Sequence, residues 1–340
     1  MTKQHTKSPC CKAEIHCHGG RRRLCSSCHR TWSISSHKAG PKPKRHNYEL
    51  LKRIVLHDQK LKDQKAHYSN LSVDAIRKRF EKTLERFVSQ GIRFSKLKGS
   101  YILLADGLHF KFKKEEWVLY LCILKPRRRN KAYLLDPTMI KGAESFKRWK
   151  QAIDTIPENL RKRIVAFVSD DFRTSSKIAQ HFGWLHQLCQ FHLISALHRR
   201  RAKRKLTLKG RAIREEIYGT IRFLLATKDV KKIPFLTKKL LTLSQYPDCP
   251  KSLTMIVNEF LRKIASYRTY LEYSGLTIPR TTSPVESLGN LIRERTRSLN
   301  SPEAVFKWST AFTRFKKRMI CNGQSQRKIP QNYFLHPVYS

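Results

Sequence analysis

The stretch that decides the fold is Tyr101-Ile-Leu-Leu-Ala-Asp106-Gly-Leu-His-Phe-Lys-Phe112. Mostly apolar residues run into one carboxylate, a glycine follows, and apolar and basic side chains then alternate. Alternation with a period of two is typical of strands, and a glycine between two such runs favours a hairpin. We therefore expect a buried strand that ends at Asp106 and a hairpin that follows it.

Asp106 is the first candidate metal ligand. A carboxylate at the end of a core strand is costly unless a cation or hydrogen-bond donors compensate it. We interpret Asp106 as a ligand in a nuclease-type site.

A second apolar run also ends in acid, in the segment Arg163-Ile-Val-Ala-Phe-Val-Ser-Asp170-Asp171. Two buried strands that both end in carboxylates would be energetically costly to place side by side unless the carboxylates shared a cation. Hard oxygen ligands of this type suit Mg²⁺ or Mn²⁺. The first residue past the strand, Asp170, is favoured as the inward one. Asp171 could equally cap the helix that begins near Thr174. Further strand patterns at 117–124 and 132–135 and a helical pattern at 143–154 predict an α/β core with a mixed sheet.

A third acid, Glu286, follows Ser283-Pro284 at the start of a helical pattern. Ser283 can be the N-cap and Glu286 the N3 residue of a capping box, so the pattern fits a cap and a metal ligand equally well. On the helical wheel Glu286 shares one face with Asn290, Arg293 and Arg297. An acid, an amide and two guanidinium groups on one face suit a metal ion and a phosphodiester.

The charge balance indicates a polyanionic partner. The chain has 340 residues, with 71 Lys and Arg against 25 acids and a formal net charge of +46. Because the basic residues recur along the whole chain, nucleic acid is the favoured partner. The longest apolar run is about eight residues, against the roughly 20 needed to span a bilayer, and the first residues lack the apolar core of a signal peptide. We expect an intracellular protein, cytoplasmic and associated with the nucleoid, with no membrane partner.

Five of the nine cysteines lie before residue 29, which indicates a metal site in a reducing compartment. Cys25 and Cys28 form a Cys-x-x-Cys pair, the spacing that lets two thiolates share a tetrahedral ion. We expect Cys11 as the third ligand, and either Cys10 or Cys17 as the fourth.

The predicted ion is one structural Zn²⁺ in a zinc ribbon over residues 1–40, because so short a segment has no other core. A regular first knuckle would have a cysteine where Ser8 stands. The alternative is an unstructured basic arm with incidental thiols.

After a Pro-broken cationic linker, residues 48–56 and 72–87 show helical spacing. Ser72 can cap the second helix, whose basic face carries Arg77 and Lys78. Short helices that end in a basic one fit a helix-turn-helix-like DNA-binding module. A solvated amphipathic helix that packs on its neighbours fits equally well.

Cys189 and His192 lie three residues apart, a spacing that suits a metal site or one helix face. From composition alone, a packed thiol and a histidine at the edge of the core are favoured. A dense basic block follows at 198–205, and residues 205–275 show helical patterns only.

Taken in order, Asp106-Gly, Asp170, Cys189-x-x-His192 and Thr-Thr-Ser-Pro-Val-Glu286-Ser-x-x-Asn290-x-x-Arg293 resemble the DDE transposases of bacterial insertion sequences, in the branch related to mutator-like elements. Members of that branch often begin with a zinc ribbon and carry a helical insertion before the catalytic glutamate. The chain departs from the pattern at Ser8 and at Asp171, where many relatives have glycine.

The resemblance implies a ribonuclease-H-like fold in which Asp106, Asp170 and Glu286 are catalytic and hold two Mg²⁺ or Mn²⁺ ions. It places Cys189 and His192 in the catalytic core. The implied activity is cleavage and strand transfer of double-stranded DNA at the terminal repeats of a mobile element and at its target. Such enzymes act as dimers or larger assemblies on DNA. The alternative function is a catalytically inactive, domesticated zinc-containing DNA-binding protein.

The expected organisation divides the chain into six parts. They are a zinc ribbon (1–40), a basic linker with the helix-turn-helix-like module (41–98), the first part of the catalytic core (99–204), a helical insertion (205–275), the second part of the core (276–320) and a C-terminal tail (321–340). Basic segments at 127–129, 199–205 and 314–318 are expected to hold flanking and target DNA. The candidate DNA-binding residues are Arg21, Arg22, Arg23, Arg77, Lys78, Arg127, Arg128, Arg129, Arg199, Arg200, Arg201, Asn290, Arg293 and Arg297.

Overall fold

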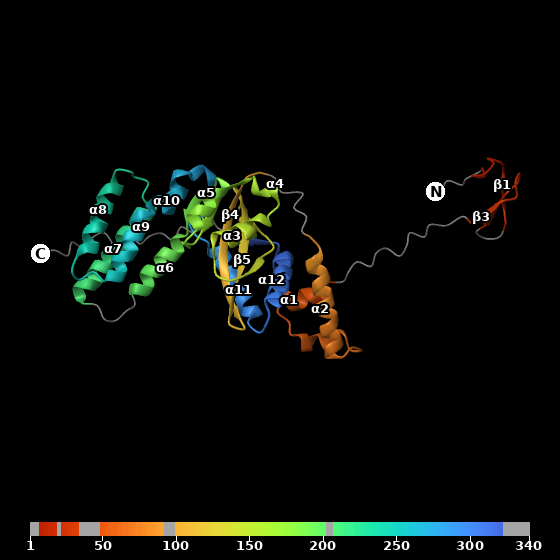
Figure 1. Ribbon diagram of the computed structural model, residues 1–340, viewed down its shortest axis with the longest axis horizontal. Coiled ribbons are helices and arrows are strands. Elements are labelled where there is room, and N and C mark those ends of the chain that lie inside the picture. Colours follow the sequence, from red (N-terminus) through yellow and green to blue (C-terminus); the bar gives the residue numbers. More distant parts are fainter. Residues whose placement is uncertain (1–6, 19–21, 34–47, 92–98, 202–206, 322–340) are drawn as a thin grey trace. The chain divides into compact units, whose positions relative to one another are not determined.

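The computed structural model describes residues 7–18, 22–33, 48–91, 99–201 and 207–321, and side chains 199–201 lie outside this description. The chain divides into two compact units, Met1–Leu50 and Leu51–Ser340. Figure 1 shows the elements of each unit.

The first unit contains a three-stranded antiparallel sheet. Its strands, in the order β1-β2-β3, are β1 (Ile15–Cys17), β2 (Arg22–Cys25) and β3 (Thr31–Ser33). Ser8 is buried, and its hydroxyl accepts hydrogen bonds from the Ala13 N–H (3.1 Å) and the Cys25 thiol (3.2 Å). The residue that replaces the expected knuckle cysteine therefore stabilises the loop beside Cys25.

The second unit is built on a seven-stranded mixed sheet, as the α/β prediction required. The strand order is β10-β6-β5-β4-β8-β9, and β7 also pairs with β5. β4 is antiparallel to β5 and parallel to β8, and β8 is parallel to β9. The strands are β4 (Tyr101–Phe112), β5 (Glu115–Pro126), β6 (Lys131–Leu134), β7 (Thr138–Lys141), β8 (Ile164–Ser169), β9 (Leu185–Leu188) and β10 (Arg318–Ile320).

The predicted hairpin after Asp106 is wrong. β4 continues through Gly107 to Phe112, and the turn to β5 is made by Lys113 and Lys114, which have φ angles of 48° and 70°. Positive φ at both central residues is what a two-residue hairpin turn of type I′ requires. β8 pairs with β4 only as far as Leu104, so Asp106 lies just past the end of β8.

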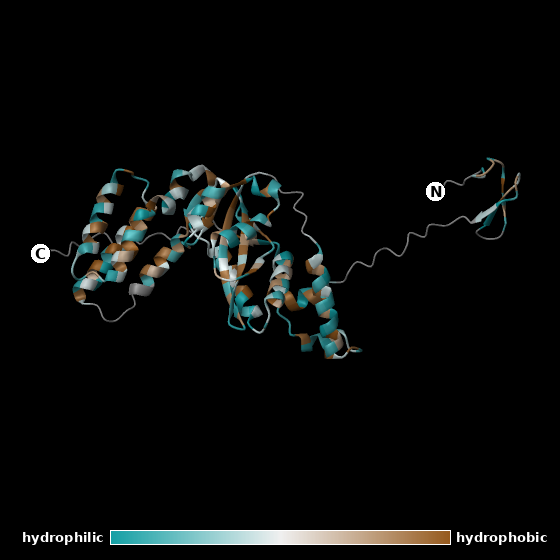
Figure 2. Ribbon diagram, viewed as in Figure 1, coloured by the Kyte–Doolittle hydropathy of each residue, from teal (hydrophilic) through white to brown (hydrophobic). Residues whose placement is uncertain are grey.

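Helices cover both faces of this sheet. On one face, α3 (Phe146–Asp154), α4 (Glu158–Arg161) and α5 (Ser175–Phe182) bury a core around Trp149, which packs edge-to-face on Tyr120 at 4.6 Å. On the other face, α11 (Ser283–Thr296) lies so close that a Cβ on Gly289 would be 3.5 Å from Leu108 and Leu121. α12 (Pro302–Lys316) packs beside α11 and against β6 and β7. Figure 2 shows hydrophobic residues along the central strands.

Three helical segments precede the sheet: α1 (Glu49–Val55), the 3₁₀ helix η1 (Leu61–His67) and α2 (Val73–Ser89). The Ser72 hydroxyl accepts a hydrogen bond from the Ala75 N–H at 3.1 Å, so the predicted cap of α2 is confirmed. α2 packs on α12, where the Phe87 and Phe315 rings stack with centroids 4.6 Å apart.

All the regular elements between residues 207 and 276 are helices, as expected. Within this segment, α9 and α10 are separated at Lys263. Figure 1 shows α7, α8 and α9 side by side, and their facing residues bury a second apolar core. The elements, with the preceding helix, are α6 (Gln190–Arg201), α7 (Leu208–Ala226), α8 (Lys232–Gln245), α9 (Lys251–Arg262), α10 (Ile264–Glu272) and the 3₁₀ helix η2 (Ser274–Leu276). Within the described ranges, none of the helices combines the length and apolar character needed to cross a membrane.

Candidate functional site

Asp106, Asp170 and Glu286 lie near enough for their charges to act on one another, beside the point where β8 ends, and we call these three residues the acidic centre. Asp106 extends from β4 past the end of β8, Asp170 directly follows β8, and Glu286 lies in the first turn of α11, which packs on β4 and β5. Residues that follow neighbouring parallel strands meet at the same edge of a sheet. The topology thus brings together three carboxylates from distant segments.

The electrostatics of the acidic centre reflect this proximity. Burial, followed by the negative charge of Asp170, raises the pKa of Asp106 to about 6. Burial also raises the pKa of Asp170 to about 6, and nearby acids including Glu286 add to the shift. Among the residues that the structure describes, no lysine or arginine forms an ion pair with Asp106, Asp170 or Glu286. Carboxylates left in mutual repulsion at a buried site are typical of positions that a cation occupies.

The two adjacent aspartates have different environments. Asp171 Oδ1 accepts a hydrogen bond from Lys263 Nζ at 2.6 Å, and Lys263 also pairs with Glu259. Asp171 is therefore compensated by a cation from the helical segment, whereas Asp170 faces the other acids. The cap that Asp171 might have provided is absent, since no side chain caps α5 at Thr174.

Glu286 is held by a hydroxyl, and the predicted capping box is wrong. The N-cap of α11 is Thr282, so Glu286 lies one position beyond N3, and no side chain caps the helix. The Thr282 hydroxyl lies 2.8 Å from Glu286 Oε1 and 3.1 Å from Cys189 Sγ. Ser283 instead donates to Thr281. The cap is lost because the preceding threonine takes the N-cap position and its hydroxyl is directed to Glu286 and Cys189.

Cys189 and His192 lie against this glutamate. Cys189 directly follows β9, and its thiol is 3.9 Å from Glu286 Oε1, while His192 Nδ1 is 3.6 Å from the same oxygen. The Cys189 thiol, together with the carboxylates of Glu286 and Asp170, raises the pKa of His192 to about 9 despite its burial. The ligand atoms of Cys189, His192 and Glu286 lie within 4.8 Å of one another, a geometry that could hold a metal ion.

A polar stripe leads away from Glu286 along α11. Asn290 and Arg293 on α11 and Arg297 at its C-cap are all exposed. Arg295 points elsewhere, because its guanidinium donates to the carbonyls of Val55 and Leu56 at 3.2 and 2.9 Å.

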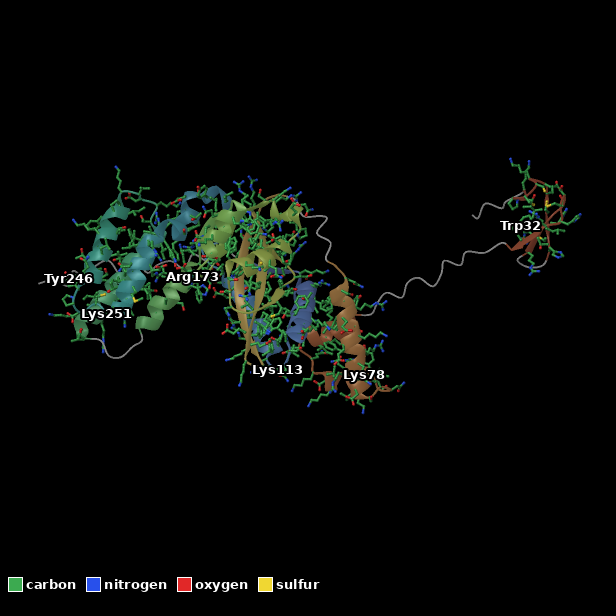
Figure 3. All side chains as sticks on the ribbon, viewed as in Figure 1. Trp32, Lys78, Lys113, Arg173, Tyr246 and Lys251 are labelled. Carbon is green, nitrogen blue, oxygen red and sulfur yellow. The ribbon has the colours of Figure 1, made fainter. Side chains whose placement is uncertain are left out.

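The other candidate DNA-binding residues are mostly at the surface. Arg22, Arg77, Lys78, Arg128 and Arg129 are exposed. Figure 3 shows Lys78 on α2 and Lys113 at the β4–β5 turn projecting outward. Arg23 is partly buried, and its guanidinium donates to the Arg22 carbonyl at 3.1 Å.

Two basic segments differ from the expectation. Arg127 Nε donates to the Gly275 carbonyl at 2.9 Å, so this residue joins the turn to the helical segment. Arg314 is bound inside the protein, with a 2.7 Å ion pair to Asp136 and hydrogen bonds to the Phe87 and Gln90 carbonyls. Its expected role in holding DNA is therefore wrong, because its donors are already used. Arg21 and the side chains of Arg199, Arg200 and Arg201 lie outside the described residues.

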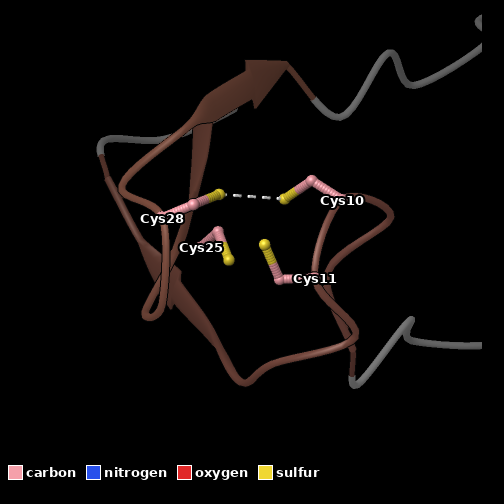
Figure 4. Close-up of side chains that lie close together, drawn as sticks. All are labelled: Cys10, Cys11, Cys25 and Cys28. Atoms are coloured by element: carbon pink, nitrogen blue, oxygen red, sulfur yellow. Dashed lines mark hydrogen bonds between the residues drawn. The ribbon is translucent and has the colours of Figure 1, made fainter.

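Four cysteines form a cluster in the first unit. The sulfur atoms of Cys10, Cys11, Cys25 and Cys28 lie within 4.8 Å of one another, with Cys10 Sγ 3.4 Å from Cys28 Sγ (Figure 4). Cys17 is exposed at the end of β1 and is not part of the group. Four clustered thiols could hold a tetrahedral zinc ion. Between the two predicted fourth ligands, the geometry groups Cys10 with the others.

Two residues near the acidic centre were missed by the sequence reasoning. Thr282 carried no signal beyond its place before a helix start. Glu144 precedes α3, in a segment interpreted only as helical, and it is discussed below. The feature of the sequence that could have revealed Glu144 was Gly107, a glycine within a strand pattern, but this glycine was interpreted as a turn residue.

No family model matches the chain, and no curated protein matches it in sequence. Among solved structures, the chain is similar to the Drosophila P element transposase strand transfer complex. That match has a TM-score of 0.43 and 10% sequence identity, and it covers 81% of this chain and 92% of that chain.

Proposed function

We propose that this protein is a DDE-type transposase that binds the ends of a mobile element and catalyses metal-dependent DNA cleavage and strand transfer. The observation that carries the proposal is the meeting of Asp106, Asp170 and Glu286 beside the point where β8 ends. No lysine or arginine of the described ranges pairs with them, in a chain of net charge +46. A local excess of negative charge in so basic a protein is best explained by a divalent cation that these carboxylates would hold.

The topology supports a ribonuclease-H-like core. The antiparallel strands β6, β5 and β4 are followed by β8 and β9, which run parallel to β4. In this order Asp170 and Cys189 directly follow the parallel strands β8 and β9, and Asp106 lies within β4 just past its last pairing with β8. Glu286 reaches the same edge from the helix that covers one face.

The donor set fits Mg²⁺ or Mn²⁺. Asp106 and Asp170 offer only carboxylate oxygens, the hard ligands that these ions prefer. The burial and mutual repulsion that raise their pKa values favour a positive charge at this position. Two bound ions would activate a water or a 3′-hydroxyl and stabilise the leaving oxygen of an in-line displacement.

The surrounding side chains have separate tasks in this scheme. Thr282 fixes the Glu286 carboxylate. Asn290, Arg293 and Arg297 offer donors to phosphate oxygens along α11, with guanidinium groups suited to bidentate contacts. The charged His192 imidazole limits repulsion within the acidic centre. The cysteine cluster holds a structural zinc ion, and the exposed basic face of α2 contributes to binding the element ends.

The test is a cleavage and strand-transfer assay on DNA that carries the element ends, in Mg²⁺ or Mn²⁺. Asp106→Ala and Asp170→Ala should each abolish both reactions while DNA binding measured by mobility shift is kept. DNA binding without any metal-dependent cleavage by the unaltered chain would favour the alternative, an inactive DNA-binding protein.

A further inference from the structure

Gly107 is a glycine because a glutamate occupies the place of its side chain. It pairs with Tyr120 in the regular part of β4, so no turn explains it. A Cβ built on Gly107 would overlap with Glu144 Oε1 and lie 2.9 Å from Glu144 Cδ, whereas real Cβ atoms essentially never come closer than 3.0 Å. The Glu144 carboxylate therefore rests on the strand backbone at the residue next to Asp106.

This carboxylate has little compensation. Its side chain is 18% exposed, and its one ion-pair partner in the described structure is His109, whose Nε2 lies 3.8 Å away and whose side chain is 61% exposed. Arg148, in the first turn of α3, donates to the Ala143 carbonyl at 2.7 Å instead. Glu144 is thus a largely buried acid without a lysine or arginine partner.

One buried donor beside Glu144 lacks an acceptor. Tyr120, directly opposite Gly107, borders the Glu144 carboxylate, and its buried hydroxyl has no hydrogen-bond partner among the described residues. A glutamate whose role was only to satisfy the core would be expected to accept this hydrogen. Its carboxylate keeps acceptor capacity for another partner.

The neighbours of Glu144 in the other direction are Asp106 and Asp170. The Glu144 carboxylate rests on Gly107, the residue that follows Asp106 in β4, and Asp170 directly follows β8, the strand that pairs with β4. β8 does not pair with β4 beyond Leu104, so the edge of β4 at Asp106 and Gly107 is open. Asp106 and the Glu144 carboxylate on Gly107 therefore both border this open edge.

We infer that Glu144 is a fourth carboxylate of the acidic centre and a ligand of the divalent cation that Asp106 and Asp170 hold. The inference rests on the proposed function, because it needs that cation. It explains why β4 keeps a glycine in mid-strand next to its aspartate. It also explains why, in the described structure, a largely buried glutamate remains without a lysine or arginine partner.

The test is Mn²⁺ binding to the full chain, with zinc already loaded, measured by electron paramagnetic resonance of the free ion without DNA. Glu144→Gln keeps the shape of the side chain and removes its charge. It should weaken Mn²⁺ binding about 10- to 100-fold, the range typical when a residue that supports a metal site is removed. The matched control is Glu158→Gln on α4, which removes an exposed glutamate paired with Lys162 and should leave binding unchanged.

Two further variants, Asp106→Asn and Asp170→Asn, distinguish a failure of the inference about Glu144 from a failure of the proposed metal site. If both weaken Mn²⁺ binding while Glu144→Gln binds as the unaltered chain does, Glu144 is a packing residue and the inference is overturned with the proposed function intact. If neither aspartate substitution weakens binding, the proposed metal site itself fails, and the inference fails with it.

Gly107→Ala provides an independent check, because its methyl group would displace the Glu144 carboxylate. This variant should lose Mn²⁺ affinity as Glu144→Gln does. In a Glu144→Ala background the displaced group is absent, so adding Gly107→Ala should cost no further affinity. A further loss in the double variant would mean that Gly107 acts independently of Glu144 and would overturn the inference.

Discussion

The Thr282 hydroxyl lies 2.8 Å from Glu286 Oε1, and the residue is fully buried at the start of α11. The contact fixes the carboxylate of the third acid within the first turn of its own helix. It also joins Glu286 to Cys189, because the Thr282 N–H donates to the Cys189 thiol at 3.2 Å.

Removal of this hydroxyl should impair the proposed reaction without removing an acid. Thr282→Val keeps the shape of the side chain and loses the donor to Glu286, so cleavage should slow about 10- to 100-fold. Thr282→Ser keeps the hydroxyl and should retain most of the rate. Equal activity of the valine and serine variants in a single-turnover assay would show that the contact does not position Glu286.

Substitution of Asp170 and substitution of Asp171 should have different effects on cleavage and on stability. Asp171→Asn breaks the ion pair with Lys263 and should cost about 1 kcal/mol of unfolding free energy, since the pair is partly exposed. Cleavage should persist in this variant. Asp170→Asn should lose cleavage without any loss of stability, because burial raises the pKa of the Asp170 carboxyl and disfavours its charged form. Denaturant unfolding and the cleavage assay measure the two effects, and a reversed pattern would assign the metal-binding role to Asp171.

The metal-free acidic centre should make stability depend on pH. Because the folded-state pKa of Asp106 is raised from 3.8 to about 6, the folded chain holds its proton more tightly than the unfolded chain. The stabilisation from the protonated form is present below pH 4 and is lost as the pH rises from about 4 to about 6, and it amounts to roughly 3 kcal/mol at most. Asp106→Asn should therefore gain stability relative to the unaltered chain across this window. Parallel unfolding curves for the two proteins over this range would contradict the assignment.

The cysteine cluster can be tested by zinc content. Cys10→Ser removes one of the four clustered thiols and should reduce bound zinc below one ion per chain and weaken DNA binding. Cys17→Ser removes an exposed thiol outside the cluster and should change neither quantity. Zinc content, measured by atomic absorption after extensive dialysis, distinguishes the two variants. Zinc loss in the Cys17 variant alone would identify Cys17, and not Cys10, as the fourth zinc ligand.

Much of the sheet and its helices could be predicted, because the spacing of apolar residues along the sequence follows the buried face of each strand or helix. The helix start near Thr174, the cap at Ser72 and the strand before Asp170 all agree with the structure. β10 was missed because a three-residue edge strand carries too little pattern to distinguish it from loop.

The errors arose where long-range contacts decide local structure. Gly107 suggests a turn in the sequence, but the space over it is filled by Glu144, which is 37 positions away in the chain. Arg314 belongs to a basic cluster in sequence, yet Asp136 and two carbonyls bind it inside the fold. The choice between Asp170 and Asp171 likewise depends on Lys263, which no local pattern connects to either residue.

The most direct measurement of the central claim is single-turnover DNA cleavage by Glu286→Gln in Mg²⁺. Glutamine can still accept the Thr282 hydrogen bond, so α11 should begin as before and the unfolding free energy should not fall, while the negative charge that completes the acidic centre is lost. The account predicts that cleavage is abolished with DNA binding and stability retained. Cleavage at the rate of the unaltered chain would contradict it and would leave Glu286 as a structural residue of α11.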